Sequence, residues 1–328
     1  MDSEPVTGPG NGRTAPPAQI VVAIPCCNEA ITIAKVIADF RRALPQAPVH
    51  VFDNNSTDGS GEAATRAGAF VHFVPSPGKG EVVRAMFREI DADVLVMADG
   101  DDTYPADRVA ELIAPVLQGR AEMAVATRLA EHHAGSFRAL HLFGNRLVLR
   151  LINTLFGTQL SDVLSGYRAF SGRFAKSTPV LSRGFEIETE ITLHALEHRK
   201  PIVEVPLPYG TRPEGSTSKL STLQDGRRVV ATLFMLYKDY RPMLFFGVPG
   251  GLLLAAGIVA GIAVVGEFVE SGRVAGIARA VFAVACCLLG TVSVATGLVL
   301  DTVNRRTREL YVLLADHVVG QRHPPQSR

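Results

Sequence analysis

Three carboxylates, Asp99, Asp101 and Asp102, lie within four residues at the end of an apolar run, residues 94–98. Like charges this close raise one another's pKa values unless a positive charge lies among them. Carboxylates on either side of Gly100 can face one side of a tight turn, and Mg²⁺ and Mn²⁺ prefer such oxygen ligands together with substrate phosphates. The spacing therefore predicts a Mg²⁺ or Mn²⁺ site at Asp99 and Asp101.

A second interpretation needs no metal ion. The acidic turn precedes a helical pattern that begins near Tyr104, and either Asp102 or Thr103 has the right chemistry to cap that helix. The two interpretations are compatible, because Asp102 can cap the helix while its neighbours bind a cation.

The elements around this turn are predicted from an alternation of two patterns between residues 20 and 205. Strand-like runs rich in β-branched residues are residues 19–25, 49–53, 69–74, 93–99 and 121–127. Runs with helical periodicity are residues 28–44, 59–68, 78–90 and 104–117. Apolar strands that alternate with helices predict an α/β fold with a mostly parallel sheet covered on both faces. Ligands of such sheets bind beyond the carboxyl ends of the strands.

Other polar residues are predicted at this same edge of the sheet. Pro25 and Glu29 lie at and after the end of the first strand, and Asp53 closes the second. Asp53 leads into a polar run suited to a turn around a nucleoside, although a simple Asx turn explains it equally well. Lys79 stands at a helix start, where ammonium and backbone N–H groups can meet phosphate; a solvated surface lysine is the alternative.

Composition bounds the classes of function. The chain has 328 residues and a net charge of +1, so its overall charge does not favour nucleic-acid binding. Residues 1–19 are polar and rich in Gly and Pro and are expected to form a disordered leader. The cysteines form two adjacent pairs without the spacing of a zinc site.

The G-x-G-x-x-A match at residues 59–64 lacks the acidic residue of a dinucleotide site and is attributed to chance.

Two segments near the end of the chain, residues 242–266 and 280–300, contain no charged residue. Each is long enough to cross a hydrocarbon core of about 30 Å, and neither has the polar face expected of a helix in a soluble domain. Basic residues flank the outer ends of the pair, whereas two glutamates lie in the short connection. The positive-inside bias predicts a hairpin in the cytoplasmic (inner) membrane, with the soluble domain and both termini on the cytosolic side.

The polar blocks resemble, in order, those of glycosyltransferase family 2. They read IPCCNEA, VFDNNSTDGS, VMADGDDTYP, SDVLSGYRAFS, SRGFEIETEI and EVPLPYGTRPEGSTSKL. Within the family the chain looks closest to the polyprenyl-phosphate sugar transferases of the dolichyl-phosphate mannose synthase type, from Ile20 to Arg241. This resemblance implies a GT-A-type, Rossmann-like sheet followed by interface helices and two transmembrane helices.

The resemblance also implies roles for individual residues. The expected donor-binding residues are Pro25, Glu29, Asp53, Asn55, Lys79, Asp99, Gly100, Asp162, Ser165, Gly166, Glu186 and Glu190. The expected catalytic residues are Asp101, Arg128, Glu188 and Arg212, and the metal ligands are Asp99 and Asp101. Arg128, Ser218 and Lys219 are expected near the acceptor phosphate, with Arg138 and Arg146 as further candidates. Which of the three glutamates contacts the sugar stays open.

The chain also departs from the family's pattern. Cys27 stands where the family often has Tyr, and Asn54 where it often has a second Asp, so recognition of the base is expected to differ. The motif DGDDTYP replaces the family's more usual DADLQ-x-P motif, so the identity of the transferred sugar stays open.

This resemblance implies inverting transfer of a hexose from a UDP- or GDP-linked sugar to polyprenyl or dolichyl phosphate. The acceptor phosphate is ionised near neutral pH, so the reaction needs little help from a general base. Catalysis then requires cations that position the phosphate and a metal ion that stabilises the leaving diphosphate. One alternative is a catalytically silent, membrane-anchored scaffold that binds nucleotide sugar, and another is transfer to a different lipid. A processive polysaccharide synthase is disfavoured because the chain has no Trp for a Q-x-x-R-W block.

The predicted organisation follows the chain. It comprises a cytosolic GT-A domain at residues 20–222, amphipathic interface helices at 223–242, a hairpin at 243–301 with spans at 243–266 and 278–300, and a cytosolic tail at 302–328. For residues 223–242, a helix packed on the sheet is the alternative. Two G-x-x-x-G pairs, at 247–251 and 257–261, predict close helix approach, either in homo-oligomers such as tetramers or within the hairpin itself.

Overall fold

The computed structural model describes residues 18–128, 136–182, 187–210, 234, 237–273 and 276–320, without the side chains of residues 128, 136–145, 308 and 311–320. The described residues form two compact units. The first comprises the described parts of Met1–Ala126, Ser165–Ile187 and Pro201–Ser216. The second comprises those of Thr127–Leu164, Glu188–Lys200 and Thr217–Arg328.

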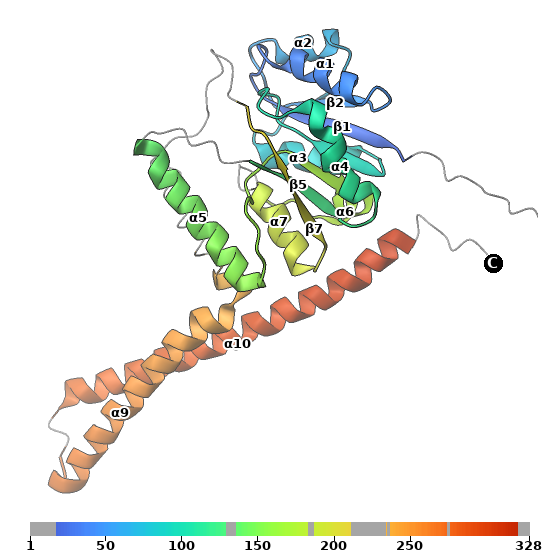
Figure 1. Cartoon of the computed structure of the whole chain (residues 1–328). Helices are drawn as coiled ribbons and strands as arrows, with labels where there is room; N and C mark the ends of the chain where they lie inside the picture. The colour runs from blue at the N-terminus through green and yellow to red at the C-terminus, as the bar shows by residue number, and fades with distance from the viewer. Residues whose placement is uncertain are drawn as a thin grey trace, which may run out of the picture. The chain divides into compact units, whose positions relative to one another are not determined.

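The first unit contains a seven-stranded sheet in the order β3-β2-β1-β4-β6-β5-β7. Four of these strands, β1, β2, β5 and β7, are labelled in Figure 1. Its strands are β1 (Ile20–Cys26), β2 (Val49–Asp53), β3 (Phe70–Phe73), β4 (Val94–Met97), β5 (Met123–Arg128), β6 (Arg168–Ser171) and β7 (Ile202–Leu207). β1 pairs in parallel with β2 and β4, and β2 pairs in parallel with β3. β6 runs antiparallel to β4 and β5. The predicted mostly parallel α/β sheet is confirmed.

Helices cover both faces of this sheet. They are α1 (Ile33–Ala43), α2 (Ser60–Arg66), α3 (Lys79–Glu89), the 3₁₀ turn η1 (Ala106–Arg108), α4 (Val109–Leu117) and α6 (Gly172–Ser177). Because successive strand residues point to opposite faces, Val22 and Ile24 of β1 share one apolar cluster with α1 and α4. On the other face, the Phe87 ring of α3 meets the Phe170 ring of β6 edge-on at 5.2 Å.

β1 continues through Pro25 in the middle of the sheet, a position that proline rarely occupies. Its register with β4 runs only from Ile20 to Ala23, whereas its register with β2 continues through Pro25 and Phe52. Pro25 therefore lies beyond the end of the β1–β4 ladder, where its missing N–H costs no hydrogen bond to β4. From Pro25 the chain continues to the carboxyl edge of the sheet, where the polar site residues are expected.

The second unit has its own apolar cluster, which involves α5 (Ser136–Phe156) and α7 (Ile187–Glu197). Its buried members are Val148, Ile152, Val163 and Leu193. Tyr240 packs against this cluster, and its ring meets the Phe156 ring at 5.3 Å. Arg241 Nη2 donates to the Leu155 carbonyl at 2.9 Å. The end of α5 is thus joined to the residues that lead into the apolar hairpin.

The hairpin consists of a π-helical turn (Met243–Gly247), α9 (Val248–Ser271) and α10 (Ile277–Gly320), and α9 and α10 lie side by side (Figure 1). Two segments, Met243–Ser271 and Ile277–Thr307, are long and apolar enough to cross a membrane, judged by length and composition. Helix α10 continues to Gly320, so the first part of the predicted tail is helical. The predicted domain boundaries stay predictions.

Glycines allow α9 and α10 to approach closely. A Cβ at Gly257 would lie 2.6 Å from Cys287 Sγ, and a Cβ at Gly290 would lie 2.7 Å from the Gly250 carbonyl oxygen. At Gly261 a Cβ would meet nothing within 4 Å. Gly257 therefore serves the packing of the hairpin itself, which is one of the two alternatives left open by the sequence. Homo-oligomer formation stays a prediction.

We expect Gly257→Leu to lower the stability of the full chain in mild detergent, because a side chain there must displace the backbone of α10. Overpacking of this kind costs about 1–3 kcal/mol. Thermal unfolding checks this, with Gly261→Leu on the same helix as the matched control. Equal unfolding temperatures for the two variants would contradict the packing role of Gly257.

Candidate functional site

The acidic turn lies at the carboxyl end of β4. Ala98 N donates to the Ala23 carbonyl at 3.3 Å, which continues the attachment to β1 up to the turn. Asp99 is half-buried, and Asp101 is only 3% exposed. The predicted placement of these carboxylates at the carboxyl edge of the sheet agrees with this geometry, while their roles in binding stay predictions.

Asp99 meets two other predicted site residues. Lys79 Nζ, at the start of α3, lies 2.7 Å from Asp99 Oδ1, with only 12% of the lysine side chain exposed. The interpretation of Lys79 as a solvated surface lysine is therefore wrong. A Cβ at Gly166 would lie 2.4 Å from Asp99 Oδ2, so only glycine leaves room for this carboxylate. The ammonium supplies the positive charge that the acidic turn requires.

Tyr104 belongs to the same cluster and was not predicted from the sequence. Its hydroxyl accepts a hydrogen bond from Gly166 N at 3.0 Å, and its ring lies 5.4 Å from that of Tyr209. Burial, and next the negative charge of Asp99, raise the pKa of Tyr104, so it remains a neutral phenol. Nothing in the sequence indicates this contact, because a tyrosine near a helix start looks the same whether or not its hydroxyl meets a distant loop.

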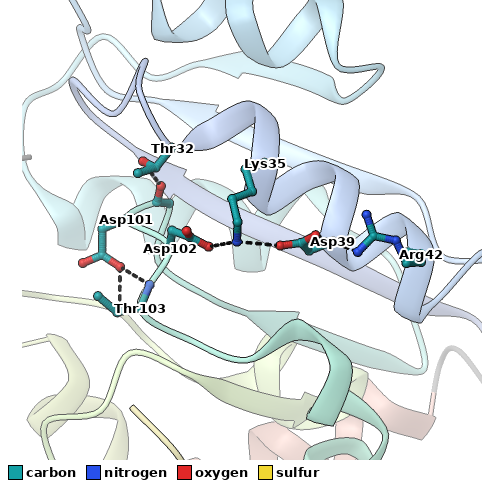
Figure 2. A network of polar contacts seen from close by, with 8 residues as sticks. Thr32, Lys35, Asp39, Arg42, Asp101, Asp102 and Thr103 are labelled. Atoms are coloured by element: carbon teal, nitrogen blue, oxygen red, sulfur yellow. Dashed lines mark hydrogen bonds and ion pairs between the residues drawn. The ribbon is translucent and has the colours of Figure 1, made fainter. Parts of the chain in front are cut away.

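Asp101 and Asp102 have different partners (Figure 2). Thr103 donates to Asp101 Oδ1 through its hydroxyl at 2.6 Å and through its N–H at 3.3 Å. Lys35 Nζ lies 2.7 Å from Asp102 Oδ1. The first helical turn after the loop begins at Ala106 without a side-chain cap. The expectation that Asp102 or Thr103 caps this helix is wrong, because both side chains are engaged within or across the acidic turn.

The loops after β1 and β2 are held together by hydrogen bonds. Asn28 N donates to Ser56 Oγ at 2.9 Å, and Glu29 N donates to Ser60 Oγ at 2.8 Å. Asp53 Oδ1 accepts from Ser56 N at 3.1 Å. These bonds bring Glu29, after β1, and Asp53, at the end of β2, to one edge of the sheet, and their contact with a nucleoside stays a prediction.

Gly61, part of the G-x-G-x-x-A match, has a local explanation. A Cβ at Gly61 would lie 3.0 Å from Asp53 Oδ2. The glycine therefore makes room for the Asp53 carboxylate.

Asn54 organises the loop that leads to Lys79. Its buried amide donates to the Val74 carbonyl at 3.0 Å and to the Ser76 carbonyl at 2.7 Å, and its Oδ1 accepts from Gly78 N at 2.8 Å. A carboxylate at this position cannot donate, so the amide is required by the loop. The sequence had marked Asn54 only as a departure from the family's usual Asp.

Asn55, a predicted donor-binding residue, also contacts this loop. Its amide donates to the Val74 carbonyl at 3.2 Å and to the Pro75 carbonyl at 3.0 Å. Asn55 adopts a positive φ of 60°, which asparagine tolerates better than most residues. Its side chain therefore supports the loop between β3 and α3, and its contact with a donor stays a prediction.

Gly100 and Ser165 are buried in the first unit, and the other predicted site residues not yet placed fall into two groups. Four lie in the second unit: Asp162, Glu188, Glu190 and Arg146. Asp162 Oδ1 accepts from Leu164 N at 2.9 Å, and Glu188 is 4% exposed at the start of α7. Glu186, Arg212, Ser218 and Lys219, and the side chains of Arg128 and Arg138, lie outside the described residues, as does most of the predicted interface helix. Their roles stay predictions.

The chemistry of the donor set fits a divalent cation that is completed by substrate. Among the described residues, no group of three or more His, Cys, Asp and Glu side chains is arranged to hold a metal ion. Asp99 and Asp101 supply two carboxylates, and Mg²⁺ is commonly bound by one or two carboxylates together with substrate phosphates and water. Asp99 and Asp101 are therefore suited to a cation that arrives with a diphosphate.

The sequence is similar to those of known glycosyltransferases. Residues 21–176 match the family described as Glycosyl transferase family 2. Glycosyltransferase AglJ from Haloferax volcanii is 35% identical over 254 residues, 77% of this chain and 83% of that protein. Polyprenol monophosphomannose synthase from Mycolicibacterium smegmatis is 26% identical over 276 residues, 79% of this chain and 98% of that protein.

A solved structure is also similar. Glucosyl-3-phosphoglycerate synthase from Mycobacterium tuberculosis, in complex with Mn²⁺, UDP-glucose and phosphoglyceric acid, matches with a TM-score of 0.53. The two are 25% identical, and the match covers 66% of this chain and 79% of that one. The likeness confirms the GT-A-type fold expected from the sequence.

We expect Asn54→Asp to lower the free energy of unfolding by about 1–3 kcal/mol, because the Ser76 carbonyl loses its amide donor, the Val74 carbonyl keeps only that of Asn55, and both then face a buried carboxylate. Chemical denaturation of the full chain in detergent checks this. Asn55→Asp is the control, because it also removes an amide that donates to two carbonyls, but its side chain is exposed and Asn54 stays in place. A loss in Asn55→Asp as large as that in Asn54→Asp would contradict the role given to Asn54.

Proposed function

The chain belongs to glycosyltransferase family 2 and is a glycosyltransferase, and we propose that it transfers a hexose from a nucleotide sugar to polyprenyl phosphate. The observation that carries the proposal is the acidic turn after β4, where Asp99 pairs with Lys79 and packs against Gly166. The Mycolicibacterium relative, named for the synthesis of polyprenol monophosphomannose, supports a lipid phosphate as acceptor. The two long apolar helices suit an acceptor that resides in a bilayer.

The donor in this proposal is a UDP- or GDP-linked hexose at the carboxyl edge of the sheet. Glu29 and Asp53, on loops joined by hydrogen bonds, would accept hydrogen bonds from the base and the ribose. Lys79 at the start of α3 would meet the diphosphate, since an ammonium and the N–H groups of a helix start both favour anions. Ser165 and Gly166 would line the pocket beside Asp99.

Asp99 and Asp101 would hold Mg²⁺ or Mn²⁺ in this site. The chemistry that such a cation would supply is stabilisation of the negative charge on the departing nucleoside diphosphate. The Mycobacterium tuberculosis neighbour, whose complex contains Mn²⁺ and UDP-glucose, supports a divalent cation. Thr103 keeps Asp101 in place through its hydroxyl and N–H, and Lys79 offers a second positive charge beside Asp99.

The acceptor needs positioning more than activation. A phosphate monoester carries most of its second negative charge at neutral pH, so it can attack the anomeric carbon without a strong general base. Arg128 and Arg212 are proposed to orient it, with Arg138, Arg146, Ser218 and Lys219 as further contacts, and Glu188 to contact the sugar. Direct attack by the phosphate oxygen would invert the anomeric configuration.

The hairpin gives the proposed reaction its location. Helices of this length and hydropathy would anchor the chain in the cytoplasmic membrane as a multi-pass protein. The basic residues Arg241, Arg305 and Arg306 flank its outer ends, and the positive-inside bias supports a cytosolic catalytic domain with both termini on the same side. A cytosolic sugar nucleotide and a membrane lipid could then meet at one site.

A second candidate function is a silent scaffold that binds nucleotide sugar without transfer. To separate the two, membranes that contain the protein are incubated with labelled UDP- and GDP-hexoses, Mn²⁺ and polyprenyl phosphate. Formation of a labelled lipid supports the proposal, and its absence with every donor would favour the scaffold. Thermal stabilisation by the same donors identifies the nucleotide.

We expect Asp101→Asn to reduce transfer by about 10²-fold or more, because metal stabilisation of a leaving group is worth several kcal/mol. The fold is expected to persist, since asparagine Oδ1 can still accept from Thr103. Lipid-linked product and thermal unfolding are measured together, with the exposed Asp107→Asn as the control. Full activity in Asp101→Asn would remove this carboxylate from the metal site.

A further inference from the structure

The start of α1 holds the acidic turn at two points, one on each side of Asp101 (Figure 2). Thr32 Oγ1 donates to the Gly100 carbonyl at 2.6 Å, and Lys35 Nζ donates to Asp102 Oδ1 at 2.7 Å. Residues three apart lie on the same side of a helix, so both groups reach the turn from one helical face. The backbone before Asp101 and the side chain after it are therefore tied to the same helix.

The residues held by α1 adopt a backbone that needs outside support. Asp102 has a φ of 61°, in the left-handed region that is uncommon for residues other than glycine, although aspartate tolerates it better than most. Gly100 is buried, and a Cβ there would lie 3.3 Å from Ile33 Cδ1. A buried carbonyl without a partner is costly, so the Thr32 hydroxyl satisfies a group that the turn would otherwise expose to the core.

Charge acts in the same direction. Lys35 contacts Asp102, and Lys79 contacts Asp99 at 2.7 Å, so each of the two outer carboxylates of the turn faces an ammonium. These ammonium groups reduce the repulsion among three neighbouring carboxylates. Asp101 lies between them with its Oδ1 bonded to Thr103.

We propose that Thr32 and Lys35 are positioning residues that hold the acidic turn in the geometry in which it binds a divalent cation. The inference rests on the proposed function, because it concerns the same metal site. Neither residue touches the cation; Thr32 acts through the Gly100 carbonyl and Lys35 through the Asp102 side chain. Groups that orient metal ligands from behind typically change metal affinity by about 10–100-fold when removed.

The competing explanation is that Lys35 forms an ordinary surface ion pair. Its side chain is 61% exposed, and it also contacts Asp39, four residues later, at 2.9 Å. Exposed pairs of this kind add little to global stability. This makes Asp39→Asn a matched control, because it removes an ion pair from the same lysine and helix while leaving the contact with Asp102.

The test measures Mn²⁺ binding directly and needs no turnover. Full-length protein in detergent is titrated with Mn²⁺ in the presence of UDP and, separately, of GDP, and free Mn²⁺ is read by electron paramagnetic resonance. The variants are Thr32→Val, Thr32→Ser, Lys35→Met and Asp39→Asn. Thermal unfolding in EDTA reports whether each variant is folded before metal is added.

We expect the Mn²⁺ dissociation constant to rise about 10-fold in Thr32→Val and in Lys35→Met. Thr32→Ser, which keeps the hydroxyl, and Asp39→Asn are expected to bind as the wild type does. A merely structural role would lower the unfolding temperature in EDTA without moving the dissociation constant. Because Lys35 is exposed, Lys35→Met decides the question if Thr32→Val does not fold.

Two results would overturn the inference, and they differ in what else they overturn. Wild-type affinity in Lys35→Met and in folded Thr32→Val, with tight binding by the wild type, would reject the positioning role and leave the proposed function intact. Absence of Mn²⁺ binding by the wild type with either nucleotide would reject the metal site itself and, with it, the positioning role.

Discussion

The Lys79 ammonium lies 2.7 Å from the Asp99 carboxylate, and three separate parts of the chain meet around this pair. Lys79 begins the helix after β3, Asp99 follows β4, and Gly166 precedes β6 and leaves room for the carboxylate. Removing two charges from water is costly, and only close contact compensates for the loss of hydration. The positions of three loops at the carboxyl edge of the sheet therefore depend on one another through this pair.

Hydrogen bonds extend this dependence across the rest of the edge. The loops after β1 and β2 exchange bonds through Asn28, Ser56 and Ser60, and Asn54 fixes the loop before Lys79. Most of these bonds join a side chain of one loop to the backbone of another. A donor would thus meet groups that are already in place, which lowers the entropic cost of alignment. Such an arrangement suits a transferase that must hold a flexible sugar diphosphate in a single orientation.

Five of the seven strands could be predicted from the sequence, because each is a short apolar run rich in β-branched residues. β6 could not, since its sequence RAFS has no β-branched residue and begins with Arg168, a buried arginine whose Nε donates to the Ser165 carbonyl at 2.7 Å. Pro206 within β7 weakens its strand pattern, and the sheet tolerates it because β7 lies at the edge.

The same contrast holds in the site. Asp99 and Asp101 were predictable because their signal is local, a cluster of like charges after an apolar strand. Thr32, Lys35 and Asn54 were not, since their partners in the acidic turn and in the loop before Lys79 lie 20–68 residues away. Only tertiary contacts reveal that a threonine hydroxyl or an asparagine amide supports another loop.

Helix α10 runs unbroken from Ile277 to Gly320. Forty-four helical residues extend about 66 Å, roughly twice the hydrocarbon thickness of a bilayer. In a membrane, the part beyond the lipid would act as a lever whose direction is fixed by the tilt of the part within it. A change in bilayer thickness that alters this tilt would move the far end of the helix further than the part within the lipid.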